Sequence, residues 1–162
     1  MTGPVPDTVR RVRLYLNTSA LNRPFDDLTV PNVRAEAEAV LLLVAEFEAG
    51  RAELLASQYL LFEVEQTPDR DRAQRVRSLL RLATSTVKTS PTLVARARGL
   101  ERSGLRGLDA LHVASAEAGG ADLLVTTDDR MLRRARRVRS EVRVDVVRPV
   151  QALARLSVER EP

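Results

Sequence analysis

The sequence predicts an α/β fold with a central, mostly parallel sheet that helices cover on both faces. Short apolar segments at 12–16 and 123–126 have the composition of buried strands. Between them, the segment 32–49 repeats apolar residues at helical spacing and carries glutamates largely on its other faces. Strands and helices alternate in this way along the chain, and neighbouring parallel strands require such helical crossovers.

The composition restricts the kind of protein that this chain can form. Its 162 residues, 44% of them hydrophobic, are typical of one globular domain, which we expect to span 1–162. No segment resembles a signal peptide or a membrane-spanning helix, so we expect a cytoplasmic protein. The chain has no cysteine and a single histidine, His112, which argues against zinc and leaves hard, oxygen-bound ions as candidate metals.

The first predicted strand ends in a polar break. Residues 12–16 form this strand, and Asn17-Thr18-Ser19 follow it directly. The segment 22–31 is rich in Asn, Asp and Pro, so we expect a loop there. Asn32 can then cap the long helix, and Gly50 can close it.

The middle of the chain continues the alternation of strands and helices. Ser57 can cap a short helix after a strand, and Pro68 interrupts that helix. A further helix begins at Pro91, because proline suits the first helical position. In order, we expect a strand at 53–56, the short helix, a helix at 69–83, a strand near 86–88 and a helix at 91–102.

The last part of the chain adds two more strands. Gly119-Gly120 ends a helix, and the run at 123–126 has the apolar composition of a fully buried strand. Pro149 can open a final helix. In order, we expect a helix at 108–118, a strand at 123–126, a helix at 129–138, a strand at 142–147 and the final helix.

Four oxygen-bearing side chains stand where predicted strands end or helices begin. Asn17 and Asp128 each follow a predicted strand, and ligands of parallel sheets bind beyond the carboxyl ends of the strands. We therefore expect these two residues to be neighbours. Glu63 and Asp109 lie on predicted helices that can pack over the same edge, so all four side chains can converge on one pocket.

A cluster of carboxylates requires a compensating positive charge. Glu63, Asp109 and Asp128 would repel one another in water unless a hard cation such as Mg²⁺ or Mn²⁺ binds between them. An ion of this kind can acidify a water molecule and stabilise charge on a phosphate. The pattern therefore predicts a site for Mg²⁺ or Mn²⁺ that acts on a phosphodiester.

Four sequence motifs carry a resemblance to a known family. They are Leu14-Tyr15-Leu16-Asn17-Thr18-Ser19, Asn22-Arg23-Pro24-Phe25-Asp26-Asp27, Gly107-Leu108-Asp109-Ala110-Leu111-His112-Val113-Ala114 and Leu124-Val125-Thr126-Thr127-Asp128-Asp129-Arg130. Together they resemble the PIN-domain family, the metal-dependent ribonucleases that include VapC-type toxins of bacterial toxin–antitoxin pairs. The resemblance covers about 12–153 and implies a three-layer α/β/α fold with its core in that range.

The resemblance also implies a role for each of the four positions. The family's four acidic positions fall, in order, on Asn17, Glu63, Asp109 and Asp128. Thr126 resembles the hydroxyl that family members place beside the fourth acid. Glu65 remains an alternative to Glu63, and Asp129 to Asp128, because a single sequence leaves both registers open.

Asn17 departs from the family pattern. An amide oxygen can ligate a metal, but the site loses one negative charge and a bridging carboxylate. The resemblance implies an endoribonuclease that cleaves RNA, has an antitoxin partner and forms a homodimer. The departure at Asn17 implies an alternative, a catalytically weakened PIN-fold module that binds RNA or a protein.

The charge distribution is compatible with an RNA substrate. The chain has 26 basic and 22 acidic residues and a net charge of +4, which permits polyanion binding. The densest basic run, 130–139, can be a solvated helix face or a track for RNA phosphates. Arg23 and Arg130 are the candidate phosphate contacts. Aromatic residues make up 3% of the chain, which argues against base stacking as the main mode of recognition.

Each candidate residue also has a purely structural interpretation. Asp109 and Asp128 stand near helix starts, where a carboxylate can cap the helix or interact with its dipole. Asn17 could be a turn former, and Glu63 a half-exposed helix residue. His112 stands one helical turn after Asp109, and we expect a packed helix histidine in preference to a catalytic base or ligand.

Overall fold

The central feature of the fold is a sheet of five parallel strands in the order β3-β2-β1-β4-β5, seen in a computed structural model that describes residues 10–159. β1 lies in the middle and pairs with β2 on one side and β4 on the other. The α/β fold class is confirmed, and the sheet is entirely parallel. The strands are β1 (Arg13–Leu16), β2 (Glu53–Ser57), β3 (Ser85–Val87), β4 (Leu123–Val125) and β5 (Asp145–Val147).

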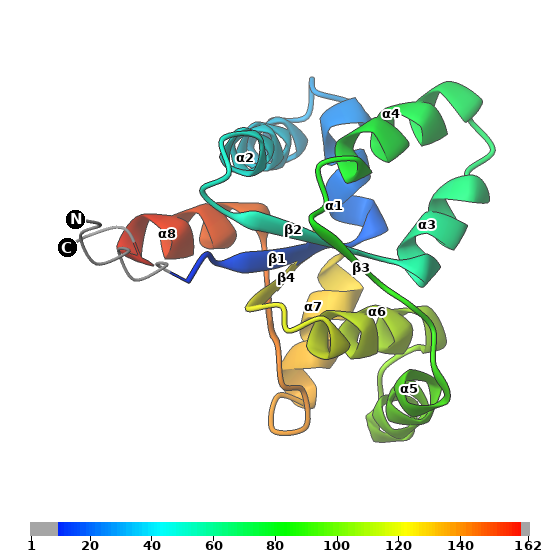
Figure 1. The fold of residues 1–162 in the computed structure, drawn as a ribbon. Coiled ribbons are helices and arrows are strands. Elements are labelled where there is room, and N and C mark those ends of the chain that lie inside the picture. Colours follow the sequence, from blue (N-terminus) through cyan, green and yellow to red (C-terminus); the bar gives the residue numbers. More distant parts are fainter. Residues whose placement is uncertain (1–9, 160–162) are drawn as a thin grey trace, which may run out of the picture.

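Helices cover both faces of the sheet, which makes three layers (Figure 1). α2 and α8 pack against each other on one face, and α5 and α6 pack against each other on the opposite face (Figure 1). The helices are α1 (Thr18–Asn22), α2 (Pro31–Glu48), α3 (Gln58–Glu65), α4 (Arg70–Leu80), α5 (Pro91–Ser103), α6 (Gly107–Ala118), α7 (Asp129–Arg137) and α8 (Pro149–Glu159), with a 3₁₀ helix, η1, at Arg23–Phe25.

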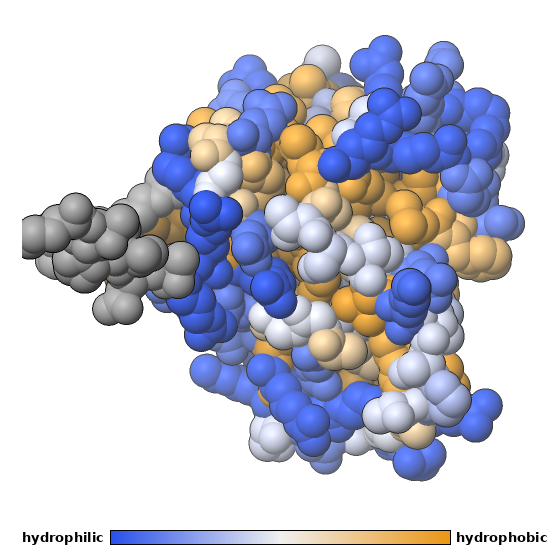
Figure 2. All heavy atoms as spheres, viewed as in Figure 1, coloured by the Kyte–Doolittle hydropathy of each residue, from blue (hydrophilic) through white to orange (hydrophobic). Residues whose placement is uncertain are grey.

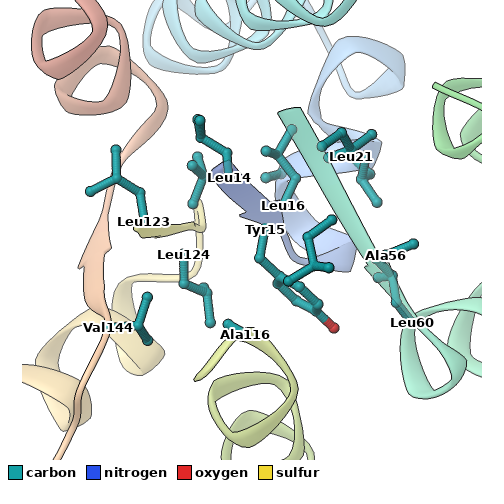
Figure 3. Close-up of a cluster of buried hydrophobic side chains, with 14 of the residues drawn as sticks. Leu14, Tyr15, Leu16, Leu21, Ala56, Leu60, Ala116, Leu123, Leu124 and Val144 are labelled. Atoms are coloured by element: carbon teal, nitrogen blue, oxygen red, sulfur yellow. The ribbon is translucent and has the colours of Figure 1, made fainter. Parts of the chain in front are cut away.

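The core is built on alternate faces of β1. Leu14, Tyr15 and Leu16 are all completely buried, as expected for a strand in the middle of a sheet that is covered twice. Figure 3 shows Leu14 and Leu16 pointing to one face, whereas Tyr15 and Leu124 point to the other face, toward α6. The carboxyl end of β1, where Asn17 follows, is therefore held firmly from both sides.

The segment expected to be a polar break and loop is largely helical. Asn17 is the N-cap of α1, and its side-chain oxygen accepts a hydrogen bond from the Ala20 backbone N–H. Pro24 stands within η1, where its fixed φ fits the first helical turn. The expected loop at 22–31 was wrong for these residues because short helical turns use the same Asn and Pro residues that favour loops.

Two further boundaries differ from the expectation. The expected cap at Asn32 is wrong, because α2 begins at Pro31 and its N-cap, Val30, makes no side-chain hydrogen bond. Proline takes the first helical position since it lacks an N–H that would need a partner. The expected strand at 142–147 is shorter, because the three-residue β4 offers ladder partners only to Asp145–Val147.

The surface shows polar helices around apolar residues. Figure 2 shows hydrophilic side chains gathered over α4, while hydrophobic residues are visible over α3 and between the helices. The exposed apolar residues of α3 are Leu61 and Phe62, which are 36% and 62% exposed. Among residues 10–159, no helix combines the length and the apolar composition needed to span a bilayer.

Gly119, at the end of α6, stabilises the fold through its lack of a side chain. A Cβ at this position would overlap the Leu55 side chain of β2 and approach Val87 Cγ2 of β3 to 2.8 Å. We expect Gly119→Ala to lower the free energy of unfolding by about 1–3 kcal/mol, the usual cost of overpacking. Chemical denaturation measures this change.

Gly99→Ala in α5 is the matched control for this prediction. The nearest atom to a Cβ there is Arg102 Nη2 at 3.8 Å, so the added methyl group fits. Because alanine is the better helix former by about 1 kcal/mol, this variant should be at least as stable as the parent. Equal effects of the two substitutions would contradict a specific close approach at Gly119.

Candidate active site

Asn17 and the residues after β4 meet at the carboxyl ends of the two central strands. Leu16 stands beside Val125 in the parallel ladder, and the Asn17 backbone N–H donates to the Val125 carbonyl at 3.1 Å. The Asn17 side-chain Nδ2 donates to Thr126 Oγ1 at 2.8 Å. The strand ends that the sequence placed at one edge are therefore in direct contact.

Both polar atoms of the Asn17 side chain have partners within the protein. Its Oδ1 accepts from Ser19 Oγ at 2.8 Å and from the Ala20 N–H at 3.2 Å. Its Nδ2 also approaches Met131 Sδ at 3.4 Å, and the residue is only 6% exposed. The amide oxygen is consequently turned toward the start of α1.

Glu63 is held in one orientation by two neighbours. Thr18 Oγ1 lies 3.0 and 2.9 Å from its two carboxylate oxygens, and His112 Nε2 lies 2.5 Å from Oε1. Burial alone would raise the pKa of Glu63, but the His112 hydrogen bond and charge and the Thr18 hydrogen bond lower it overall. Glu63 is therefore ionised at neutral pH.

Glu65, the alternative in this register, lies elsewhere. Its side chain is about half exposed and forms ion pairs with Arg70 and Arg77. Glu63 and Glu65 are two residues apart on α3 and therefore lie on different sides of the helix. Glu63, and not Glu65, points toward α1 and α6.

A buried chain of hydrogen bonds extends from Glu63 into the core. His112 Nδ1 and the Tyr15 hydroxyl are 2.7 Å apart, and the same hydroxyl is 2.7 Å from Ser57 Oγ. His112 is 3% exposed, and burial raises the pKa of Tyr15. His112 is packed, as expected from the sequence, but both of its ring nitrogens also have polar partners.

Asp109 lies in the first turn of α6 with part of its carboxylate exposed. Burial raises the pKa of this carboxyl, and the negative charges of Asp128 and Glu63 raise it further. The positive charges of His112 and Arg134 oppose this shift, and Arg134 Nη1 is 3.8 Å from Asp109 Oδ2. The charges of Asp128 and Glu63 therefore both act on Asp109.

Asp128 is the N-cap of α7, so its structural interpretation from the sequence holds. Its Oδ1 accepts from the backbone N–H groups of Arg130 and Met131 at 2.9 and 3.2 Å. The cap uses one carboxylate oxygen and leaves Oδ2 for another partner. Asp129, the alternative in this register, is exposed and pairs instead with Arg148.

The sequence of this chain matches a known family over most of its length. A family model described as PIN domain matches residues 14–137. The chain belongs to the PIN domain family. A comparison with curated proteins finds no match.

Three solved structures share the fold of this PIN domain. PAE2754 from Pyrobaculum aerophilum has a TM-score of 0.55 and 17% sequence identity, over 91% of this chain and 90% of that one. FitAcB from Neisseria gonorrhoeae has a TM-score of 0.55 and 15% sequence identity, over 85% of this chain and 98% of that one. VapBC2 from Rickettsia felis, solved with a DNA fragment from their promoter, has a TM-score of 0.52 and 15% sequence identity, over 85% of this chain and 98% of that one. At these sequence identities, the structural similarity shows that the chains share a fold and no more than that.

The PIN domain holds its acidic residues in a looser arrangement than the sequence suggested. Among residues 10–159, no three His, Asp or Glu side chains are grouped as a metal site. Glu63 is tied to His112 and Thr18, and the Asn17 oxygen already accepts two hydrogen bonds. Asp109 and Asp128 remain as a like-charged pair of hard oxygen donors, which suits one Mg²⁺ or Mn²⁺ with water completing its shell.

The residues expected to contact substrate differ in their accessibility. Thr126 is fully buried, and its hydroxyl accepts hydrogen bonds from the Asn17 amide and from the Asp128 backbone N–H, so it holds the ends of β1 and β4 together. Arg23 pairs with Asp26 and Glu36. Arg130 is exposed, and within residues 10–159 it has no carboxylate partner.

Sequence reasoning missed three residues of this site. Thr18, Ser19 and Tyr15 were quoted only as parts of a motif, yet Thr18 holds Glu63 and Ser19 Oγ accepts from the Thr127 N–H at 3.1 Å. The single available signal was the polar hydroxyl of Tyr15 within an otherwise aliphatic strand end. A buried tyrosine hydroxyl normally has a hydrogen-bond partner, and here it has two, His112 and Ser57.

Proposed function

We propose that this PIN domain is a metal-dependent endoribonuclease that holds one Mg²⁺ or Mn²⁺ between Asp109 and Asp128. The observation that carries the proposal is the position of Asp128 at the carboxyl end of β4, beside Asn17 and Thr126, with one carboxylate oxygen outside the helix cap. The negative charge of Asp128 also helps to raise the pKa of Asp109, after the larger effect of burial. Like charges held together at a partly open edge destabilise the fold, and a hard cation bound between them removes that penalty. PIN domains are in general nucleases, which supports the same function.

The neighbouring side chains would orient the reactants. A bound cation would supply an acidified water and stabilise charge on the phosphate. Glu63, ionised and held by Thr18 and His112, can accept a hydrogen bond from water at this edge. Arg134, close to Asp109, and the exposed Arg130 can contact phosphate oxygens of a single-stranded RNA.

The direct test of this proposal is cleavage of single-stranded RNA by the parent and by Asp109→Asn. We expect cleavage by the parent to require Mg²⁺ or Mn²⁺, and the variant to be slower by about a hundredfold, because a neutral amide holds the ion poorly. Gel electrophoresis of a labelled RNA measures both rates. Asp71→Asn, the same change at an exposed position of α4, is the control and should cleave like the parent.

Asp109→Asn should slow cleavage, but in the absence of metal it should make the folded protein more stable at neutral pH. Because the folded-state pKa of Asp109 is raised, its proton stabilises the fold at low pH, and this stability is lost as pH rises through that pKa. Without metal, Asp109→Asn should therefore exceed the parent in stability at neutral pH, by up to about 1 kcal/mol, and lose this advantage in acid. Thermal unfolding with and without Mg²⁺ measures this.

With Mg²⁺ bound, the parent should be more stable than Asp109→Asn, which reverses the order expected without metal. Mg²⁺ binds the folded parent and should raise its melting temperature, whereas Asp109→Asn should respond weakly. Identical responses of both proteins to Mg²⁺ would show that Asp109 is not a metal ligand, whatever the cleavage assay reports.

A second candidate function is a binding module that has lost catalysis. The observation that favours it is the Asn17 side chain, whose oxygen accepts hydrogen bonds from Ser19 and Ala20 and lacks the negative charge of an acid. In this case, the parent would bind RNA or a protein partner but would show no metal-dependent cleavage.

An antitoxin partner is a further part of the proposal. It is supported by the family and by the shared fold with VapBC2 from Rickettsia felis and FitAcB from Neisseria gonorrhoeae. A toxin of this kind would be neutralised by a protein that covers the acidic edge. The homodimer expected from the family resemblance, the RNA substrate and the cytoplasmic location also stay predictions.

A further inference from the structure

A groove runs along the open edge of β5, away from the acidic residues. Among residues 10–159, β5 pairs with β4 only and is therefore an edge strand of the sheet. α7 and α8 lie on opposite faces of the sheet beside it (Figure 1). The cavity between them has a volume of about 400 Å³, and residues from both helices and from the whole of β5 line it. This is the position that a sixth strand would occupy.

The backbone of β5 presents unused hydrogen-bonding groups to this groove. The Val147 carbonyl accepts from the Thr126 N–H at 3.0 Å and so faces β4. Because successive residues of a strand direct their N–H and C=O groups to opposite sides, Val146 directs its own pair to the open edge. An edge strand with such free groups can accept another strand.

The walls of the groove are apolar near the strand and basic at the rim. Leu132 and Ala135 of α7 are buried along one side. Four arginines line the groove together with a single carboxylate, Asp145; they are Arg136, Arg139, Arg148 and Arg155. The groove therefore carries an excess of positive charge.

Two of these arginines have no anionic partner in the part of the chain that the structure describes. Arg155 pairs with Asp145 at 3.2 Å, and Arg148 pairs with Asp129 and Glu36. Arg136 and Arg139 form no ion pair with any carboxylate within residues 10–159. Arg136 lies in the last turn of α7, and Arg139 lies in the turn that follows the helix; both line the groove, so both guanidinium groups are available to one ligand.

We propose that this groove binds an extended acidic segment of a partner protein, which adds to β5 as a strand. Its backbone would pair with Val146, and its carboxylates, on alternate residues, would meet Arg136 and Arg139. The charge favours an acidic ligand, and the free backbone groups and apolar wall favour a polypeptide over a nucleic acid. The proposal does not depend on catalysis, because the groove contains none of the four acidic-site positions.

The test uses a fluorescein-labelled peptide of alternating valine and glutamate and measures its binding to the full chain by fluorescence anisotropy. We expect the double variant Arg136→Glu and Arg139→Glu to bind at least about tenfold more weakly, because two attractive contacts become repulsive. The matched control is Arg133→Glu with Arg137→Glu, which makes the same charge change at two exposed positions of α7 that do not line the groove. It should bind the peptide like the parent.

Amide hydrogen exchange separates strand addition from simple charge attraction. Bound peptide should slow exchange at the Val146 N–H, and N-methylation of alternate peptide residues should abolish binding. Equal losses in the two double variants would overturn the proposal. Binding of single-stranded RNA through Arg136 and Arg139, with no change in the amide exchange rate of Val146, would also overturn the proposal. The groove would then be a binding site for RNA phosphates. Failure of RNA cleavage would leave the groove proposal standing, because peptide binding is measured directly.

Discussion

Asn17→Asp should bind Mg²⁺ or Mn²⁺ more tightly than the parent and cleave RNA faster, by about tenfold or more in each case. The substitution adds a carboxylate beside the ends of β1 and β4, where Asp128 already stands. One additional negative charge strengthens attraction for a divalent ion and provides the bridging oxygen that an amide lacks. Calorimetric metal titration and the rate of RNA cleavage measure the two effects.

The fold should tolerate this substitution. Aspartate caps a helix as well as asparagine does, so the hydrogen bond to the Ala20 N–H can be kept. Thr126 Oγ1, which accepts from Asn17 Nδ2, is a hydroxyl and can donate to a carboxylate oxygen. Without metal, the added repulsion from Asp128 should make the variant slightly less stable than the parent.

Asn22→Asp is the matched control for this gain of function. Asn22 ends α1 and lies 3.4 Å from Arg72 Nη1, so the same added charge finds a basic partner outside the acidic edge. Its metal affinity should equal that of the parent. If Asn17→Asp changes neither metal binding nor cleavage, position 17 is a structural cap alone, and a weakened metal site is the wrong interpretation.

His112→Phe should lower the free energy of unfolding by about 2–4 kcal/mol. Phenylalanine can fill much of the space of the ring, but it breaks the hydrogen bonds to Glu63 and Tyr15. The half-buried Glu63 carboxylate would then keep Thr18 as its remaining partner. Urea denaturation measures the loss, and a double-mutant cycle with Glu63→Gln isolates the contribution of this pair.

The pH dependence of stability should identify the same interaction. The folded-state pKa of Glu63 is lowered from its ordinary value of 4.5, so its contribution is fully present above that value and is lost as pH falls through the folded-state pKa. In His112→Phe, this acid-dependent part should shrink. A parent and a variant with parallel stability profiles below neutral pH would contradict a stabilising His112–Glu63 interaction.

His112→Phe should also slow RNA cleavage, because Glu63 loses the contact that orients it. If cleavage is unchanged while stability falls, the chain from Ser57 to Glu63 serves only to stabilise the core. Tyr15→Phe is the milder comparison, since it removes one hydroxyl from the same chain and leaves the His112–Glu63 contact in place.

The order of strands and helices could be predicted from local sequence. The apolar run at 123–126, the amphipathic run at 32–49 and the cap at Ser57 each have a local cause, and each lies within one or two residues of the observed element. Such features depend on neighbours a few residues away. α1 and η1 were missed because polar residues and proline favour short helical turns and loops alike.

The meeting of the strand ends that carry Asn17 and Asp128 could also be predicted, but the side-chain contacts made there could not. Parallel strands bring Asn17 and Asp128 to one edge, whatever the details of packing. The direction of the Asn17 amide oxygen depends on the packing of α1, α3 and α6, and so does the choice of the α3 glutamate that turns inward. No local pattern encodes the meeting of Glu63 with His112.

By itself, the sequence determined the succession of elements, the parallel sheet and the edge at which Asn17 and Asp128 lie, because propensity, capping and hydrophobic periodicity act over short distances. Only the tertiary structure decided that Glu63 is held by His112, that the Asn17 amide faces α1, and that β5 leaves an arginine-lined groove open. These contacts join residues far apart in the chain, and their geometry follows from how whole helices pack on the sheet.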